Sequence, residues 1–140
     1  MTGKEYLMQI RNIQVKVNII RNEIEVIKAK LGYQSPGFDS IGSHPKNSYV
    51  EDKTTRLVLR LSEKQKELEE ELIRLEEKKA EIKAVLFQLD NPLEIEVLYR
   101  RYFLCEKWDE IRDGISFADR QPFRIHDSGI EKIEKIIKKD

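Results

Sequence analysis

The chain has 140 residues, of which 39% are hydrophobic and 37% are charged, and its formal net charge at pH 7 is zero. This length allows one ordinary domain or two small ones, and the abundance of Glu, Lys, Leu and Ile is typical of long amphipathic helices. The balanced charge excludes a molecule that attracts nucleic acid through its overall charge, so a DNA-binding surface would need a local excess of cations.

The single cysteine, Cys105, excludes an internal disulfide and suits a reducing cytoplasm. We expect it to be a buried, small hydrophobic residue rather than a catalytic thiol. The N-terminus lacks the apolar segment of a signal peptide, and no apolar run approaches the roughly 18 residues that a membrane span needs. The sequence therefore predicts a soluble, cytoplasmic protein with no membrane partner.

The first predicted helix begins with a capping box, in which the hydroxyl of Thr2 accepts a backbone hydrogen bond and the carboxylate of Glu5 reaches back to the cap residue. Apolar residues then recur at alternating steps of four and three, the spacing that keeps facing a neighbouring helix. Gly32 is suited to the left-handed position that ends the helix. The apolar seam consists of Tyr6, Ile10, Ile13, Val17, Ile20, Ile24, Ile27 and Leu31.

Residues 32–49 are rich in Gly, Pro, Ser, Asp and Asn, which predicts a long, mobile loop. His44 lies in it without other ligands at metal-binding spacing, so we expect a solvated histidine. A second helix is predicted over about residues 50–89, and Lys64 and Gln65 interrupt its apolar side. That side carries Leu57, Leu61, Leu68, Leu72, Leu75, Ile82, Leu86 and Leu89.

Two helices joined by one loop would leave apolar surface in water if they packed only on each other. At roughly 25 cal/mol per Å², a half-exposed seam would sacrifice several kcal/mol. We therefore expect residues 1–90 to form a long antiparallel hairpin that dimerises through the eight-residue seam. An intramolecular hairpin that needs no second copy is the alternative.

The second predicted domain covers residues 91–140. Asn91 can cap a helix, Pro92 fits its first position, and Glu94 favours its N-terminal end. We expect helices over residues 92–104 and from 107 or 108, a tight turn over 114–117, and a final helix from near Asp119. The residues predicted to face inward are Trp108, Ile111, Ile115, Phe123, Ile125, Ile130, Ile133, Ile136 and Ile137. This order of elements is typical of a helix-turn-helix domain in an all-α protein.

A resemblance is carried by the C-terminal sequence LEIEVLYRRYFLCEKWDEIRDGISFADRQPFRIHDSGIEKIEKI. It is similar to the fourth conserved region of bacterial sigma factors, and closer still to small phage and prophage proteins of Gram-positive bacteria. Some of those proteins are described as late-transcription regulators. The opening TGKEYLMQIRNIQVKV, the central loop and the charged second helix also resemble that phage family. The resemblance implies a helix-turn-helix fold, DNA binding and control of transcription.

The chain departs from the family at the start of the final helix. Ser116, Phe117 and Ala118 stand where the family usually has Gly, an aromatic residue and Ser, and Pro122 replaces an apolar residue. Proline costs about 3 kcal/mol inside a helix but little in its first turn. With Asp119 as the N-cap, Pro122 falls at the third helical position, where proline is tolerated.

Basic residues slightly outnumber acidic ones in the final helix. Arg can bond guanine and Gln can bond adenine in the major groove, so the predicted base contacts are Arg120, Gln121 and Arg124. Lys132 is expected to contact bases or phosphates. Weaker candidates for phosphate contact are Arg100, Arg101 and His126. Neighbouring arginines on one helix are more often a solvated face, and the histidine could equally be partly buried with a satisfied ring nitrogen.

The sequence has no phosphate-binding glycine loop, no metal-ligand spacing and no supported Ser–His–Asp set. We therefore expect no enzyme, no catalytic residue, no metal, no cofactor and no small-molecule substrate. The favoured function is a phage-encoded transcriptional regulator that binds double-stranded DNA as a homodimer in the host cytoplasm. The alternative is a coiled-coil protein that binds a host or phage protein, such as RNA polymerase, and whose helix-turn-helix no longer contacts bases.

Overall fold

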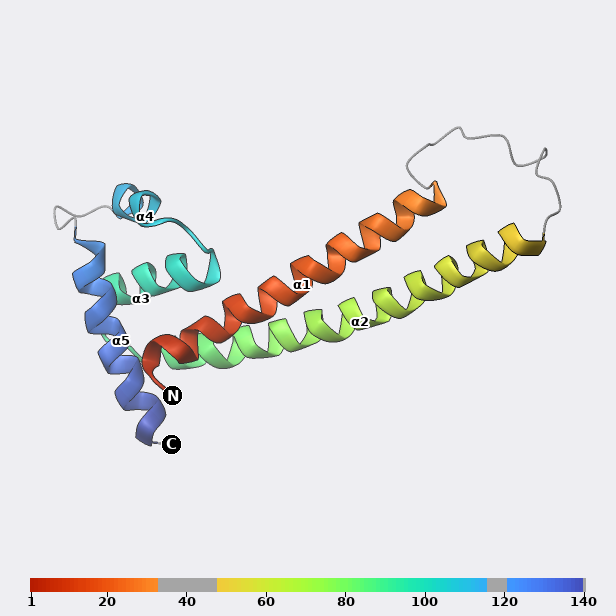
Figure 1. Cartoon of the computed structure of the whole chain (residues 1–140). Helices are drawn as coiled ribbons and strands as arrows, with labels where there is room; N and C mark the ends of the chain where they lie inside the picture. Colours follow the sequence, from red (N-terminus) through yellow and green to blue (C-terminus); the bar gives the residue numbers. More distant parts are fainter. Residues whose placement is uncertain (33–47, 116–120, 140) are drawn as a thin grey trace. The chain divides into compact units, whose positions relative to one another are not determined.

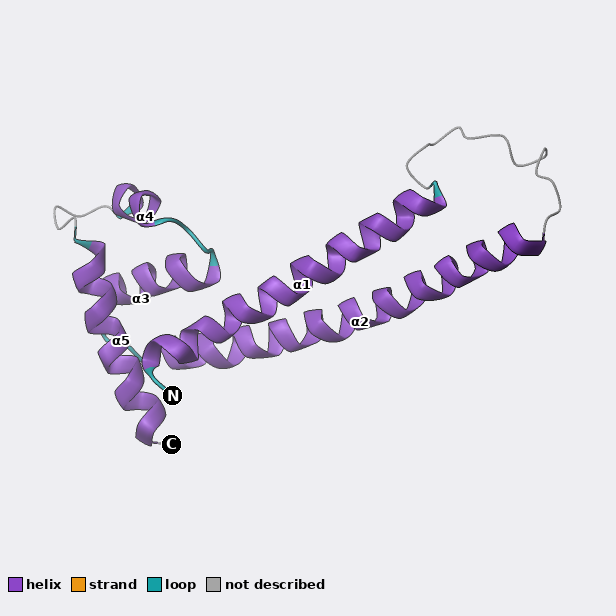
Figure 2. Cartoon of the chain, in the orientation of Figure 1, coloured by secondary structure: helices purple, strands orange, loops and turns teal. Residues whose placement is uncertain are grey.

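The computed structural model describes residues 1–32, 48–115 and 121–139, with only the backbone described for residues 48–51. These residues form helices and no strand, which confirms the all-α class (Figure 2). The elements are α1 (Gly3–Leu31), α2 (Ser48–Leu86), α3 (Pro92–Leu98), the π-helix η2 (Tyr99–Phe103), α4 (Trp108–Gly114) and α5 (Pro122–Lys139). Most of the predicted loop, with His44, lies outside the described residues.

The chain divides into two compact units. Unit 1 comprises residues 1–14 and 74–140, and unit 2 comprises residues 15–73. The two long helices each contribute to both units, so the domain boundary predicted near residue 90 falls inside unit 1. None of the helices in the described part of the chain is long and apolar enough to cross a membrane.

Hydrogen bonds at the start of α1 confirm the predicted capping box. The Glu5 N–H donates to Thr2 Oγ1 over 3.1 Å, and the Thr2 N–H donates to Glu5 Oε1 over 2.8 Å. Hydrogen bonds from Thr2 lower the pKa of the Glu5 carboxyl. At the other end of α1, Gly32 has a φ of 78°, the left-handed conformation predicted for it.

In unit 2, α1 and α2 lie side by side (Figure 1) and share one apolar core. The buried residues of that core are Ile20, Ile24, Ile27 and Leu61, and Leu31, Leu57 and Leu68 pack against them. Lys64, which interrupts the apolar side of α2, pairs with Glu23 of α1 at 3.2 Å and with Glu67 at 3.3 Å. Hydrogen bonds to these carboxylates raise the pKa of Lys64. Lys64 therefore interrupts the apolar side of α2 in order to form an ion pair between the two helices.

The α1 seam is buried within a single chain. Seven of its members are buried, and Leu31 is partly buried. In unit 1 the Tyr6 hydroxyl also donates to Glu81 Oε2 of α2 over 3.1 Å. We expected this seam to need a second copy of the chain, but the structure corrects that premise because one chain suffices to cover it. The covered residues are Tyr6, Ile10, Ile13, Val17, Ile20, Ile24, Ile27 and Leu31.

Residues 92–104 were predicted as one helix, and the structure divides them. Asn91 Oδ1 accepts from the Leu93 N–H over 2.9 Å, which confirms the predicted cap before Pro92. The helix then widens into η2, and Cys105 follows with a φ of 56°. Cys105 is exposed, so its predicted burial is wrong. The reason is that the residue lies in the left-handed turn after the helix instead of on a buried helix face.

The inward side chains of α4 and α5 agree only in part with the sequence pattern. Ile111, Ile115, Ile125 and Ile133 are buried as predicted, but Phe123 is 57% exposed. The buried face of α5 runs through Pro122, Ile125, Gly129 and Ile133. At about 100° per residue, Phe123 points away from that face.

The final helix begins later than predicted. Its first residue is Pro122, and the carbonyl of Gln121 accepts the first bonds, from Arg124 N–H at 3.1 Å and Ile125 N–H at 3.3 Å. Proline is well suited to a first helical position because its missing N–H would have no partner there. Pro122 therefore starts the helix instead of occupying its third position. Asp119, the predicted cap, lies outside the described residues.

Replacing Ile24 by Ala should lower the free energy of unfolding of unit 2 by about 2–4 kcal/mol, because the substitution opens a cavity in its core. The control is Leu59→Ala on α2, since Leu59 is 59% exposed and its truncation should change stability by less than about 0.5 kcal/mol. Urea titrations followed by circular dichroism measure both. Equal effects would contradict the burial of the seam within one chain.

Candidate nucleic-acid interface

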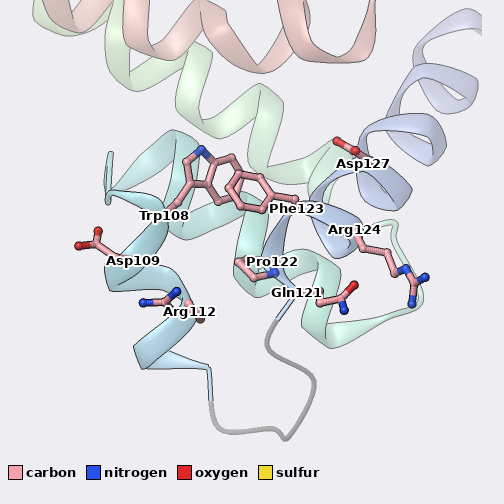
Figure 3. A pocket seen from close by; sticks show the side chains of 8 residues that line it. All are labelled: Trp108, Asp109, Arg112, Gln121, Pro122, Phe123, Arg124 and Asp127. Atoms are coloured by element: carbon pink, nitrogen blue, oxygen red, sulfur yellow. The ribbon is translucent and has the colours of Figure 1, made fainter.

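A hollow of about 750 Å³ lies between α4 and the start of α5 (Figure 3). We call it the α4–α5 hollow. Its lining residues are Trp108, Asp109 and Arg112 from α4, Gln121 directly before α5, and Pro122, Phe123, Arg124 and Asp127 from α5. Gln121 and Arg124 are two of the three residues predicted to contact bases. The third, Arg120, lies outside the described residues.

An aromatic pair forms one wall of the hollow. The ring centroids of Trp108 and Phe123 are 4.5 Å apart, with the planes tilted by 40°. The Arg101 guanidinium lies over the Trp108 ring, 4.6 Å from its centroid. Figure 3 shows Gln121 and Arg124 on one side of Pro122, and Asp109 and Arg112 on the other.

The charges in the hollow are mixed. Arg112 and Arg124 are cations, while Asp109 and Asp127 are anions that line the same hollow. Arg112 also lies 3.7 Å from the Asp113 carboxylate. This arrangement gives little net attraction for a polyanion, so binding of DNA here would depend on specific hydrogen bonds more than on overall charge.

Arg100 and Arg101, the weaker candidates for phosphate contact, have partners within the chain. Arg100 pairs with Glu106 at 3.1 Å and with Glu96 at 3.5 Å, and it donates to the carbonyl of Gly114 over 3.5 Å. Arg101 donates to the Glu106 carbonyl over 3.0 Å, in addition to its contact with Trp108. Both side chains therefore join η2 to the segment around α4.

Lys132 also has an acidic partner within the chain. Its ammonium group lies 3.0 and 3.2 Å from the two carboxylate oxygens of Glu94, which is only 3% exposed. The Ser128 hydroxyl donates to Glu94 Oε2 over 2.6 Å. A buried carboxylate needs such partners because losing its hydration is costly. Lys132 thus neutralises a buried charge between α3 and α5.

His126 is buried, and both of its ring nitrogens have partners. Of the two alternatives left open by the sequence, a phosphate contact or a buried ring, the structure matches the buried ring. Its Nε2 lies 2.7 Å from the Tyr102 hydroxyl, and its Nδ1 lies 3.0 Å from Asp127 Oδ1. These partners fit a neutral ring that donates from Nδ1 to the carboxylate and accepts from the tyrosine at Nε2. Burial lowers the pKa of His126, and Asp127 opposes that shift only in part. Burial also raises the pKa of Tyr102.

Sequence reasoning missed two features of the hollow. Arg112 was not singled out, although it lies four residues after Trp108, a spacing that puts both side chains on one side of a helix. Phe123 was expected to face inward but lines the hollow, whereas Trp108 packs against the apolar core as predicted and also borders the hollow. The described residues contain no group of three or more His, Cys, Asp or Glu side chains arranged to hold a metal ion.

Comparisons of this chain with protein families, with curated proteins and with solved structures found no match. The likeness to phage helix-turn-helix proteins therefore stays a prediction from the sequence.

Replacing Lys132 by Ala should lower the free energy of unfolding by about 1–3 kcal/mol, because the buried Glu94 carboxylate loses its cation. The control Lys135→Ala removes an exposed lysine of the same helix and should change stability by less than about 0.5 kcal/mol. Adding Glu94→Gln to the first variant should recover part of the loss. Thermal unfolding measures all three, and equal stability of the two lysine variants would contradict the role given to Lys132.

Stability should fall in mild acid because of His126. In the unfolded chain this residue titrates near its ordinary pKa of 6.5, and in the folded chain it titrates lower. The unfolded state therefore binds more protons as the pH falls below 6.5, so the stabilisation present above that pH is progressively lost. His126→Gln should reduce the difference in unfolding free energy between about pH 7.5 and pH 5.5. An unchanged difference in the variant would exclude His126 as its source.

Proposed function

We propose that the chain is a transcriptional regulator that binds double-stranded DNA through the α4–α5 hollow, with the start of α5 in the major groove. The observation that carries this proposal is that Gln121, directly before α5, and Arg124, in its first turn, line one exposed hollow together with Arg112 of α4. Helix-turn-helix proteins contact base edges with the N-terminal residues of their second helix, and their first helix crosses the backbone.

The chemistry of the exposed side chains suits this role. The Arg124 guanidinium can donate two hydrogen bonds to guanine O6 and N7, and the Gln121 amide can pair with adenine N6 and N7. Phe123, which is 57% exposed, can contact a thymine methyl group. Arg112 is then the natural phosphate contact, in place of Arg100, Arg101 and Lys132, which have partners within the chain.

In the described residues, α4 ends at Gly114 and α5 begins at Pro122. The proposed base contacts depend on this helix start, because it fixes where Gln121 and Arg124 emerge.

A second candidate function is supported by the aromatic wall of the hollow. Trp108 and Phe123 form a partly exposed pair, and aromatic residues are enriched where proteins bind proteins. Asp109 and Asp127 would repel phosphates but could pair with basic residues of a protein partner, such as RNA polymerase. In that case α4 and α5 would bind protein instead of DNA.

Selection from a random duplex pool, followed by fluorescence anisotropy, tests the DNA proposal. Arg124→Ala should weaken binding of the selected duplex by about 1–3 kcal/mol and relax specificity at one base position. Lys135→Ala is the matched control on the same helix and should change affinity far less. Asp109→Asn should improve affinity, because it removes a negative charge close to the backbone.

Failure to enrich any duplex at about 50 mM salt would exclude the DNA proposal, because electrostatic binding is strongest at low salt. Enrichment with equal affinities for the Arg124→Ala and Lys135→Ala variants would show that DNA binds elsewhere on the chain. Neither outcome would exclude the binding of a protein partner.

A further inference from the structure

The helix α1 has a second apolar face that the described residues do not cover. Val15, Ile19 and Val26 are 51%, 54% and 54% exposed, and Asn22 is exposed between them. Their spacing of four, three and four residues repeats that of the buried seam. At about 100° per residue, this face points nearly opposite to Ile20 and Ile24, which pack against α2.

The second face carries no charge, although 37% of the residues in the chain are charged. In unit 2, α1 therefore presents apolar side chains on two sides. A helix that is apolar on two sides usually lies between two neighbours. In unit 2, α2 is one neighbour of α1 (Figure 1), and none of the described residues of the hairpin supplies the other.

We propose that residues Val15, Ile19, Asn22 and Val26 bind the same face of a second copy of the chain, with the two α1 helices parallel and in register. Asn22 favours this parallel arrangement over an antiparallel one. When identical helices pair in parallel, each residue of the face meets its own copy, so the two Asn22 amides can donate to and accept from each other. An antiparallel pair centred on this face would place Asn22 against Ile19 and leave the amide without a partner.

Charges beside the face favour the same arrangement. Glu25 and Lys30 flank it on opposite sides, in the positions from which parallel helices form ion pairs five residues apart. Parallel pairing thus brings Glu25 of each copy to Lys30 of the other. Arg11 and Lys16 would repel each other in the same register, which limits the contact to the part of α1 that begins near Val15.

The proposed interface is distinct from the seam predicted from the sequence, and it does not rest on DNA binding. The seam is buried inside each hairpin, and the second face joins two hairpins that are already folded. Because only a few aliphatic side chains are covered, we expect a weak dimer whose formation depends on concentration.

Sedimentation of the full chain from about 1 μM to 1 mM tests the association. The wild type should dimerise within this range, and Ile19→Glu should raise the dissociation constant by at least about tenfold. Leu59→Glu is the control, because Leu59 is 59% exposed on α2, outside the proposed interface. Circular dichroism should show both variants as helical as the wild type, since neither residue is buried. A wild type that stays monomeric, or equal effects of the two variants, would overturn the proposal.

Cysteine cross-linking tests the orientation, in a Cys105→Ser background that removes the native thiol. Parallel pairing in register places Ile19 against its own copy, so the Ile19→Cys variant should form a covalent dimer under mild oxidation. Ser62→Cys, at an exposed site on α2, should cross-link at least about tenfold more slowly. Equal rates at the two sites would contradict the arrangement. Asn22→Leu should strengthen association, because it replaces a buried polar pair by apolar contact.

Discussion

The buried carboxylate of Glu94 fixes the rotation of α5 about its own axis. Its ion pair with Lys132 and the hydrogen bond from Ser128 hold one side of α5 against α3. Gly129 permits this close packing, because a Cβ atom there would lie 2.8 Å from Leu98 Cδ1. Because that side of α5 packs against α3, Phe123 and Arg124 face outward at the start of the helix. The residues available to a partner are therefore set by a contact that lies one to two turns further along α5.

Much of the architecture follows from local patterns in the sequence. The caps at Thr2 and Asn91 and the turn at Gly32 were predictable, because each depends on hydrogen bonds or backbone preferences within a few residues. The seam of α1 was predictable as a buried face. Its covering partner was not, because periodicity shows which face is buried and not which helix buries it. The same limit applies to Lys64, which interrupts the apolar pattern of α2, because its partner Glu23 lies on the other helix.

The candidate site was harder to predict, since its chemistry depends on residues far apart in the chain. Lys132 looked like a free cation, but its partner Glu94 is 38 residues away in the sequence. His126 meets Tyr102 across 24 residues. The start of α5 at Pro122 places Gln121 before the helix, whereas its expected start near Asp119 would have placed Gln121 inside it. Gln121 and Arg124 could be chosen because Gln and Arg suit base edges. Arg112 became a candidate only through the packing of α4 beside α5.

Because the positive and negative charges of the chain balance, the cations that form no ion pair within it are the better candidates for binding a partner. In a chain with 26 basic and 26 acidic residues, many cations are expected to be satisfied by neighbouring acids, as Arg100, Lys64 and Lys132 are. Such residues contribute to stability and are poor candidates for binding a partner, because binding would first have to break an internal pair. Arg124 differs, since within the described residues it has no ion pair and it lines an exposed hollow. Because the other side of α5 is fixed against α3, the Arg124 side chain is held where it can donate hydrogen bonds to a ligand in the hollow.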